Sequence, residues 1–218
     1  MLHDFTGQHG DGFGPYAGLI LDAAGNLYGE TEAGGTSSRC GGGCGTAYQL
    51  RPVSGGGWKE HILHDFGAIG DGAFPGGPLL LDSAGNLHGT TGVGGATGNG
   101  TVYRLTLESD GRWKETILHN FAGGANGIEP GGGVVMDSAG NLYGTTIAGG
   151  DPSCGCGVVY KLSPGARGKW NFKVLHTFVG TDGAQPAANL ILDDKGNLYG
   201  TTITGGAGGY GVAFQLTP

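Results

Sequence analysis

The sequence predicts an all-β protein, a four-bladed β-propeller built from four-stranded antiparallel blades. A unit of about 55 to 60 residues recurs four times along the 218 residues, and a repeat of that length is one supersecondary element that buries its faces against its neighbours. Each unit contains short apolar runs between glycine turns, and no stretch shows helical periodicity. The 52 glycines recur at these turns, so they separate strands and do not mark disorder.

The first two strands of each unit form a predicted hairpin. An apolar run such as Leu19–Leu21 precedes an Asp-x-x-Gly-Asn turn, and a second run such as Leu27–Tyr28 follows it. Runs this short are typical of strands buried on both faces. The aspartates that open the four turns are Asp22, Asp82, Asp137 and Asp193.

The third and fourth strands complete each predicted blade. A third strand follows the glycine-rich loop, as at Gly45–Tyr48, and a fourth extends from a tryptophan to a phenylalanine. Four antiparallel strands per unit are the architecture of a propeller blade. The fourth strands are expected at residues 58–66, 113–121 and 170–178.

The two ends of the chain predict how the ring closes. The chain begins with Leu2–Phe5, which matches the end of a fourth strand, and it stops after the third strand of the last unit. We expect this N-terminal strand to pair with the C-terminal blade. One domain then spans residues 1–218, with repeats at about 6–66, 67–121, 122–178 and 179–218 plus 1–5. The alternative is half of an eight-bladed ring, which makes the protein a homodimer instead of a monomer.

Composition excludes several classes of partner. The net charge is −7 with only 11 Lys and Arg, whereas nucleic acid and anionic membranes require a clustered basic surface. No stretch reaches the roughly 20 apolar residues of a membrane span. No signal peptide is present, so an exported protein is expected to be in a mature or trimmed form. The Gly-x-Gly strings lack the helix and the Lys-Ser/Thr of a phosphate loop.

The repeat motif resembles a known family. The pattern Leu-His-x-Phe, Asp-Gly-x-x-Pro, Asp-x-x-Gly-Asn-Leu-Tyr-Gly-Thr-Thr and Gly-x-Val-Tyr-x-Leu is similar to the Gloeo/Verruco (GloVer) tandem repeat over essentially the whole chain, and more distantly to NHL-type propeller repeats. The resemblance implies an extracellular, often surface-anchored bacterial protein, secreted or on the cell surface. It implies no catalytic residue, and this chain has no anchoring tail.

Two glutamates break the repeat pattern most sharply. Glu30 and Glu32 stand where the other units carry Thr, Gly or Ile, and two residues apart on a strand they point to the same side, roughly 7 Å apart. Glycosidase carboxyl pairs are separated by about 5 or 6.5 to 9.5 Å. The pair is therefore a candidate acid and base, or a solvated strand end.

A second set of candidates lies at the Asp-Gly-x-x-Pro turns. Near-fourfold symmetry would place their oxygen atoms around the mouth of a central channel, where they could bind Ca²⁺ or sugar hydroxyls. Asp-Gly is also an ordinary turn signal. No cofactor is predicted, and Ca²⁺ is a candidate ion. The set comprises Asp11, Asp71, Asn126 and Asp182, with Glu129 and Gln185 before the prolines; Glu129 is also a candidate catalytic carboxyl group.

The histidines are weaker candidates. His3, His64, His119 and His176 share one repeat position beside Phe, which favours packing with a satisfied hydrogen bond. His88 replaces a tyrosine of the other units, and His9 lies near Asp11 in the first loop. Both are candidate acids, bases or ligands.

The four cysteines form two pairs in equivalent loops. Cys40 and Cys44 flank three glycines, and Cys154 and Cys156 flank one. An even count in short loops favours disulfides and an oxidising compartment. We expect Cys40 to pair with Cys44, whereas a bond between Cys154 and Cys156 would close a strained ring. The alternative is a zinc site with four thiolates, although the spacing lacks Cys-x-x-Cys turns.

Two functional hypotheses remain. The first is an extracellular module without catalysis that binds a glycan or a protein through its loop face, with exposed aromatic rings as stacking surfaces. The second is a secreted polysaccharide hydrolase or lyase that uses Glu30, Glu32 or Glu129 as acid and base, aided by His9 or His88. The candidate stacking residues are Phe13, Tyr16, Phe74 and Tyr210.

Overall fold

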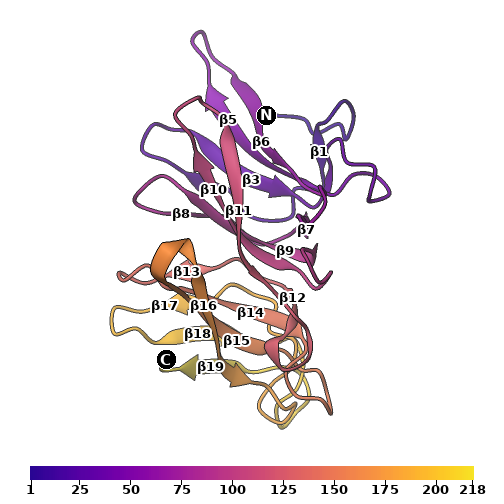
Figure 1. Ribbon diagram of the computed structural model, residues 1–218, viewed down its shortest axis with the longest axis vertical. Coiled ribbons are helices and arrows are strands. Elements are labelled where there is room, and N and C mark those ends of the chain that lie inside the picture. Colours follow the sequence, from indigo (N-terminus) through magenta and orange to yellow (C-terminus); the bar gives the residue numbers. More distant parts are fainter.

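The computed structural model describes all 218 residues and confirms an all-β protein. The exceptions are two single 3-10 turns, Gly124–Asn126 and Ala166–Gly168. Every strand pair within the sheets is antiparallel, and each repeat forms its own sheet. Figure 1 shows these sheets following one another along the molecule from the indigo N-terminal end to the yellow C-terminal end.

The strands of the first three sheets follow the predicted order, whereas sheet four has three strands and lacks the expected fourth. Sheet one has the order β2 (Ile20–Leu21), β3 (Leu27–Thr31), β5 (Thr46–Pro52), β6 (Trp58–Asp65), and the short pair β1 (Gly12–Phe13) and β4 (Ala33–Gly34) continues its inner hairpin. Sheet two contains β7 (Gly72–Pro75), β8 (Leu80–Leu81), β9 (Leu87–Gly94), β10 (Thr101–Leu107) and β11 (Trp113–Asn120). Sheet three contains β12 (Ile128–Pro130), β13 (Val135–Met136), β14 (Leu142–Ala148), β15 (Val158–Pro164) and β16 (Trp170–Thr177), and sheet four contains β17 (Ile191–Leu192), β18 (Leu198–Thr201) and β19 (Ala213–Leu216).

The Asp-x-x-Gly-Asn motif owes its recurrence to a hydrogen-bonded turn. Asp22 Oδ1 accepts the backbone N–H groups of Ala24 and Asn26, and Oδ2 accepts the Asn26 amide and the Tyr28 hydroxyl. The same bonds recur in the other three repeats, except that His88 takes the place of the tyrosine in the second. One carboxylate thus satisfies the turn and joins it to the following strand.

Aromatic pairs hold consecutive sheets together. The phenylalanine that ends each fourth strand packs edge-on against an aromatic ring on the third strand of the next sheet. Phe66 meets Tyr103 at 5.1 Å between ring centroids, and Phe121 meets Tyr160 at 5.1 Å. The three phenylalanines, Phe66, Phe121 and Phe178, are fully or almost fully buried. Burial of each such side chain contributes about 2 to 3 kcal/mol.

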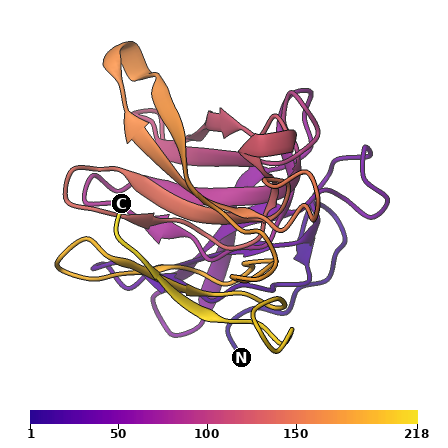
Figure 2. The same cartoon turned by 90° about the horizontal axis from the view of Figure 1, so that it is seen from below.

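The predicted ring closure is wrong. Residues 1–5 do not pair with the last sheet; Phe5 packs instead against Tyr48 of sheet one, at 5.0 Å. It takes there the place that Phe66 takes on sheet two. Strand β19 pairs only with β18, so sheet four keeps an open edge. The N-terminus lies in the upper half and the C-terminus in the lower half of the molecule in Figure 1, and in the view from below the later sheets overlie the earlier ones (Figure 2).

The structure holds no helix with the length and hydrophobicity required to span a bilayer.

Candidate functional site

Three side chains are held on left-handed backbone at one repeat position. Phe74, Glu129 and Gln185 have φ angles of 57°, 59° and 58°, and the equivalent residue of the first repeat is Gly14, at 69°. Left-handed backbone costs roughly 1–2 kcal/mol for a residue with a side chain and almost nothing for glycine. Three repeats therefore retain a strained side chain where glycine would be more stable.

Contacts between repeats impose this backbone conformation. The N–H of Phe74 donates to the carbonyl of Cys44 in the preceding repeat, at 2.8 Å, and the N–H of Glu129 donates to Asn99 at 3.0 Å. Gln185 makes the same bond to Cys156 at 2.9 Å. The three side chains themselves point to solvent and are exposed.

The residue opposite each of these positions, on the second strand, faces the same surface. In the first repeat the Glu32 N–H donates to the Gly14 carbonyl at 3.0 Å, and in the fourth Ile203 donates to Gln185 at 3.1 Å. Glu32 is exposed and lies on a bend just after β3. Across the four repeats the outward polar or aromatic side chains are thus Glu32, Phe74, Glu129 and Gln185, which we call the loop-face row.

The other aromatic residues proposed for stacking are also exposed. Tyr16 is 81% exposed in the turn after β1, and Tyr210 is 95% exposed in the last glycine loop. Phe13 on β1 is about half exposed. Each ring is thus accessible to a ligand.

Glu30 does not share a surface with Glu32. It is 2% exposed and lies between sheets one and two, where the Tyr103 hydroxyl donates to its Oε1. Burial raises the pKa of Glu30 to about 8, against the hydrogen bond from Tyr103, which lowers it. The carboxyl group is therefore neutral at pH 7 and sealed from any polymeric substrate. The expected same-side pair of carboxyl groups is not formed.

His88 is likewise a core residue. It is 1% exposed, and its Nε2 lies 3.0 Å from Asp82 Oδ2, where the other repeats place a tyrosine hydroxyl. Burial lowers the pKa of His88 although Asp82 raises it, so the ring is neutral and completes the aspartate turn of the second repeat.

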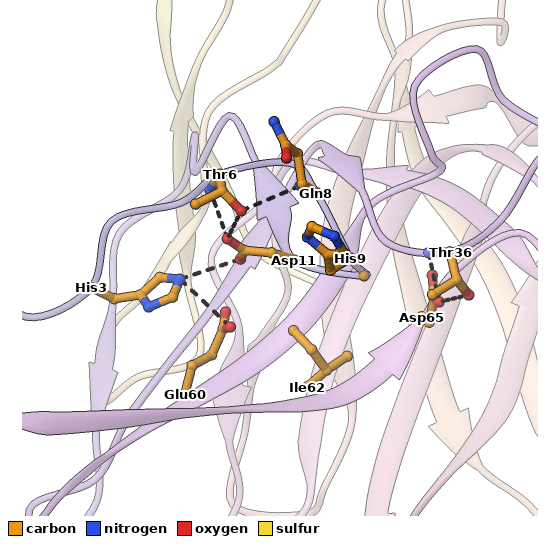
Figure 3. A pocket seen from close by; sticks show the side chains of 10 residues that line it. His3, Thr6, Gln8, His9, Asp11, Thr36, Glu60, Ile62 and Asp65 are labelled. Carbon is orange, nitrogen blue, oxygen red and sulfur yellow. Dashed lines mark hydrogen bonds and ion pairs between the residues drawn. The ribbon is translucent and has the colours of Figure 1, made fainter.

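His9 and Asp11 line a surface hollow of about 520 Å³ beside sheet one (Figure 3). His3 Nε2 lies 3.2 Å from Asp11 Oδ1 and 3.5 Å from Glu60 Oε2. Burial opposes the charged form of Asp11, but bonds from Thr6 and His3 outweigh it and leave the pKa of Asp11 below its usual value. Burial raises the pKa of Glu60, and the charge of Asp11 adds to that effect.

The same cluster recurs between sheets one and two. His64 Nε2 lies 3.0 Å from Asp71 Oδ2 and 3.7 Å from Glu115 Oε2. Burial and the charge of Asp71 raise the pKa of Glu115 to about 9. Asp182 bonds His176 at 2.9 Å. Each of these aspartates thus bonds the histidine at its own junction between repeats. The expected ring of oxygen atoms from several repeats around a channel mouth is not formed.

The third junction lacks both carboxyl groups. Asn126 and Phe172 occupy the aspartate and glutamate positions, and His119 stacks on Phe172 at 4.1 Å between ring centroids. Burial lowers the pKa of His119 to about 4. Glu60 and Glu115 were not predicted as site residues. The joint replacement of Asp by Asn126 and of Glu by Phe172 in one repeat indicates that these two positions are in contact.

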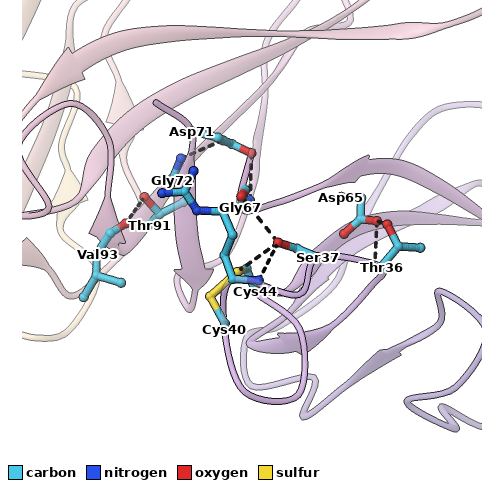
Figure 4. The surroundings of a disulfide bond; sticks show 11 residues. Thr36, Ser37, Cys40, Cys44, Asp65, Gly67, Asp71, Gly72, Thr91 and Val93 are labelled. Atoms are coloured by element: carbon cyan, nitrogen blue, oxygen red, sulfur yellow. Dashed lines mark hydrogen bonds between the residues drawn. A yellow bond between two sulfur atoms is a disulfide. The ribbon is translucent and has the colours of Figure 1, made fainter. Parts of the chain in front are cut away.

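Both pairs of cysteines form disulfides, Cys40 with Cys44 and Cys154 with Cys156. The first prediction is confirmed, and a zinc site with four thiolates is excluded because no thiol is free. Figure 4 shows the Cys40–Cys44 bond beside Ser37 and Gly67. Both disulfides lie in loops that bond the loop-face row through the backbone. The Cys44 carbonyl accepts the Phe74 N–H, and the Cys156 carbonyl accepts the Gln185 N–H.

The fold and the exposed face define a propeller-like repeat protein with a polar and aromatic loop surface. A family description, the Gloeobacter/Verrucomicrobia repeat, matches residues 1–156 and 111–218. The chain belongs to this repeat family, as its motif predicted. No curated protein sequence matches it.

Two solved structures are similar to the chain, and the first of them supports the fold. A protein solved under a provisional description as a gluconolactonase is similar with a TM-score of 0.55 and 19% identity, over 92% of this chain and 63% of that one. The chain thus spans less than two thirds of that protein. An exo-1,5-α-L-arabinanase from a bovine ruminal metagenomic library is similar with a TM-score of 0.47 and 11% identity, over 90% of this chain and 71% of that one.

Proposed function

We propose that this chain is an extracellular ligand-binding module in which each repeat supplies one propeller blade, and that it recognises a glycan through the loop-face row. The observation that carries the proposal is the left-handed backbone of Phe74, Glu129 and Gln185. Strained residues that persist without a packing role are typical of binding sites.

The chemistry of the row fits a sugar chain. Phe74 offers a ring face for stacking, and Glu32, Glu129 and Gln185 offer oxygen atoms and an amide for hydroxyl groups. The four side chains come from four consecutive repeats, so a ligand that spans them must be extended. A polysaccharide has that shape and carries hydroxyl groups along its length.

The disulfides in the glycine-rich loops of the first and third repeats support an extracellular setting, because such bonds persist in oxidising compartments. The net charge of −7 favours neutral or cationic ligands over polyanions.

Catalysis is the weaker hypothesis because its main carboxyl pair is separated. Glu30 is sealed between sheets, which leaves Glu32 and Glu129 in different repeats with Phe74 in the repeat between them. An activity screen on polymeric and chromogenic sugars should therefore show no turnover that depends on Glu32 or Glu129.

A glycan array with the wild-type protein and a triple variant tests the binding proposal. Phe74→Gly, Glu129→Gly and Gln185→Gly remove the side chains at positions where glycine suits the backbone, so the variant should fold. We expect at least a tenfold loss of affinity for the glycans that the wild type binds. Equal binding by both proteins, or binding of no glycan by the wild type, would overturn the proposal.

A further inference from the structure

Two clusters have the composition of a metal site: one joins the N-terminal segment to sheet one, at the first junction, and the other joins sheet one to sheet two, at the second junction. Each offers one imidazole nitrogen and two carboxylate oxygens, and the three ligand atoms of a cluster lie within 4.8 Å of one another. The clusters are His3, Asp11 and Glu60, and His64, Asp71 and Glu115. An imidazole with two carboxylates suits a borderline divalent ion such as Zn²⁺, whereas Ca²⁺ prefers oxygen ligands alone.

The ligands are held in place by surrounding groups, as in built metal sites. Asp71 has a side chain only 4% exposed, and it accepts the backbone N–H groups of Gly67 at 2.9 Å and Gly72 at 2.6 Å. The His64 ring is fixed by an edge contact with Phe66 at 4.6 Å. Asp11 is fixed by the N–H and hydroxyl of Thr6, at 2.6 and 2.8 Å.

Each cluster also leaves a carboxylate oxygen without a partner. Glu60 Oε1 and Glu115 Oε1 are buried and accept no hydrogen bond. A buried acceptor of this kind costs about 1–3 kcal/mol unless another group satisfies it. Oε2 is the oxygen that faces the imidazole in each cluster, so a cation bound through both oxygens of the glutamate would satisfy the free Oε1 as well.

The third junction provides an internal comparison. Its histidine is present, but Asn126 and Phe172 replace both carboxylates and the ring of Phe172 covers His119. Both carboxylates are thus lost together at this junction, as expected of two ligands of one ion. Between sheets three and four Asp182 bonds His176 without a glutamate, because sheet four has no fourth strand to supply one.

We propose that His3, Asp11 and Glu60 form one Zn²⁺-type site, and that His64, Asp71 and Glu115 form a second, each joining one repeat to the segment before it. Binding requires each histidine to be neutral with its proton on Nδ1 and both carboxyl groups to be ionised, so any proton held by the glutamate goes to solvent. The second ion would tie β6 of sheet one to β11 of sheet two, and the first would hold residues 1–6 against sheet one. This proposal is independent of glycan binding.

Zinc uptake by the untagged, chelator-treated protein tests the assignment, with equilibrium dialysis followed by elemental analysis. We expect two ions per wild-type chain, one in Glu60→Gln, one in Glu115→Gln and none in the double variant. The matched control His61→Gln removes an imidazole outside both clusters and should keep two ions. Circular dichroism of each variant checks that the fold is retained.

A second measurement separates a structural ion from an adventitious one. Zn²⁺ should raise the midpoint of thermal unfolding of the wild type and protect residues 1–6 from proteolysis, and neither effect should appear in the double variant. Ca²⁺ at the same concentration should produce no shift. Zinc uptake unchanged by both glutamate substitutions, or Ca²⁺ bound in place of Zn²⁺, would overturn the proposal.

Discussion

The hydroxyl of Tyr103 donates a hydrogen bond to Glu30 across the boundary between the first two sheets. Both groups are fully buried, and burial raises the pKa of both above their ordinary values. The equivalent residues of the next boundary are Tyr160 and Thr90. The Tyr160 hydroxyl is buried and unpaired, and the Thr90 hydroxyl donates instead to the Gly132 carbonyl at 2.8 Å. The first boundary is thus the one at which a carboxyl group completes the tyrosine contact.

This pair predicts a pH-dependent stability. The pKa of Glu30 is about 8 in the folded protein and its ordinary value is 4.5, so the folded state binds more protons than the unfolded state between these values. The contribution of Glu30 is complete below pH 4.5 and is lost as the pH rises toward 8. The slope is at most about 1.4 kcal/mol per pH unit.

Urea unfolding at pH 5, 7 and 9 measures this slope, and Glu30→Gln is the control because its amide is neutral at every pH. The free energy of unfolding of the wild type should fall more steeply with pH than that of the variant. The difference between the two curves isolates Glu30 from Glu115, whose pKa is also raised. Parallel curves would show that Glu30 does not titrate in this range.

The loop-face row predicts a trade between stability and binding. Glu129→Gly alone should raise the free energy of unfolding by up to about 1 kcal/mol, because the backbone at this position is left-handed. The same variant should bind the proposed glycan less tightly. Glu108→Gly, at an exposed carboxyl group outside the row, is the control and should not stabilise. A destabilised Glu129→Gly protein would mean that the side chain contributes to the fold.

The repeat and its strands could be predicted from the sequence because apolar runs and Gly-Asn turns are local signals. Ring closure could not be predicted, because it depends on the angle between successive sheets and on where Phe5 packs. The site was predicted only in part. Four candidates are exposed as expected, namely Tyr16, Phe74, Glu129 and Gln185. Glu30 and His88 are buried instead, because Glu30 bonds Tyr103 of the next sheet and His88 bonds Asp82 within its own turn, and neither contact is visible in the local sequence.

The disulfides predict a stability loss on reduction. The Cys40–Cys44 bond closes a loop of about five residues, and its removal should cost about 2 kcal/mol in the chain-entropy description. Because the Cys44 carbonyl accepts the Phe74 N–H, the same change should loosen the loop-face row. Thermal unfolding of Cys40→Ser/Cys44→Ser beside the wild type measures the loss, with added reductant as a check: it should lower the wild-type midpoint at least as far. An unchanged midpoint would assign the bond no stabilising role.

Replacing the glycine of an Asp-Gly turn by alanine is predicted to lower the stability of the protein more than its place in a turn alone would imply. A Cβ atom on Gly72 would overlap the Oγ1 and Cγ2 atoms of Thr91. Thr91 cannot move aside, since its hydroxyl bonds Thr101 Oγ1 at 2.9 Å and the Val93 carbonyl at 3.1 Å in the buried core. Gly72→Ala should therefore destabilise the protein by about 1–3 kcal/mol, the usual cost of overpacking.

The matched control for this substitution is Gly76→Ala, because a Cβ atom there would meet nothing within 4 Å and its φ is not positive. That variant should unfold within about 0.5 kcal/mol of the wild type or slightly above it. Chemical unfolding of both variants in parallel makes the comparison. Equal stabilities would mean that the close approach of Thr91 does not require glycine at this position; a selective loss in Gly72→Ala would show that it does.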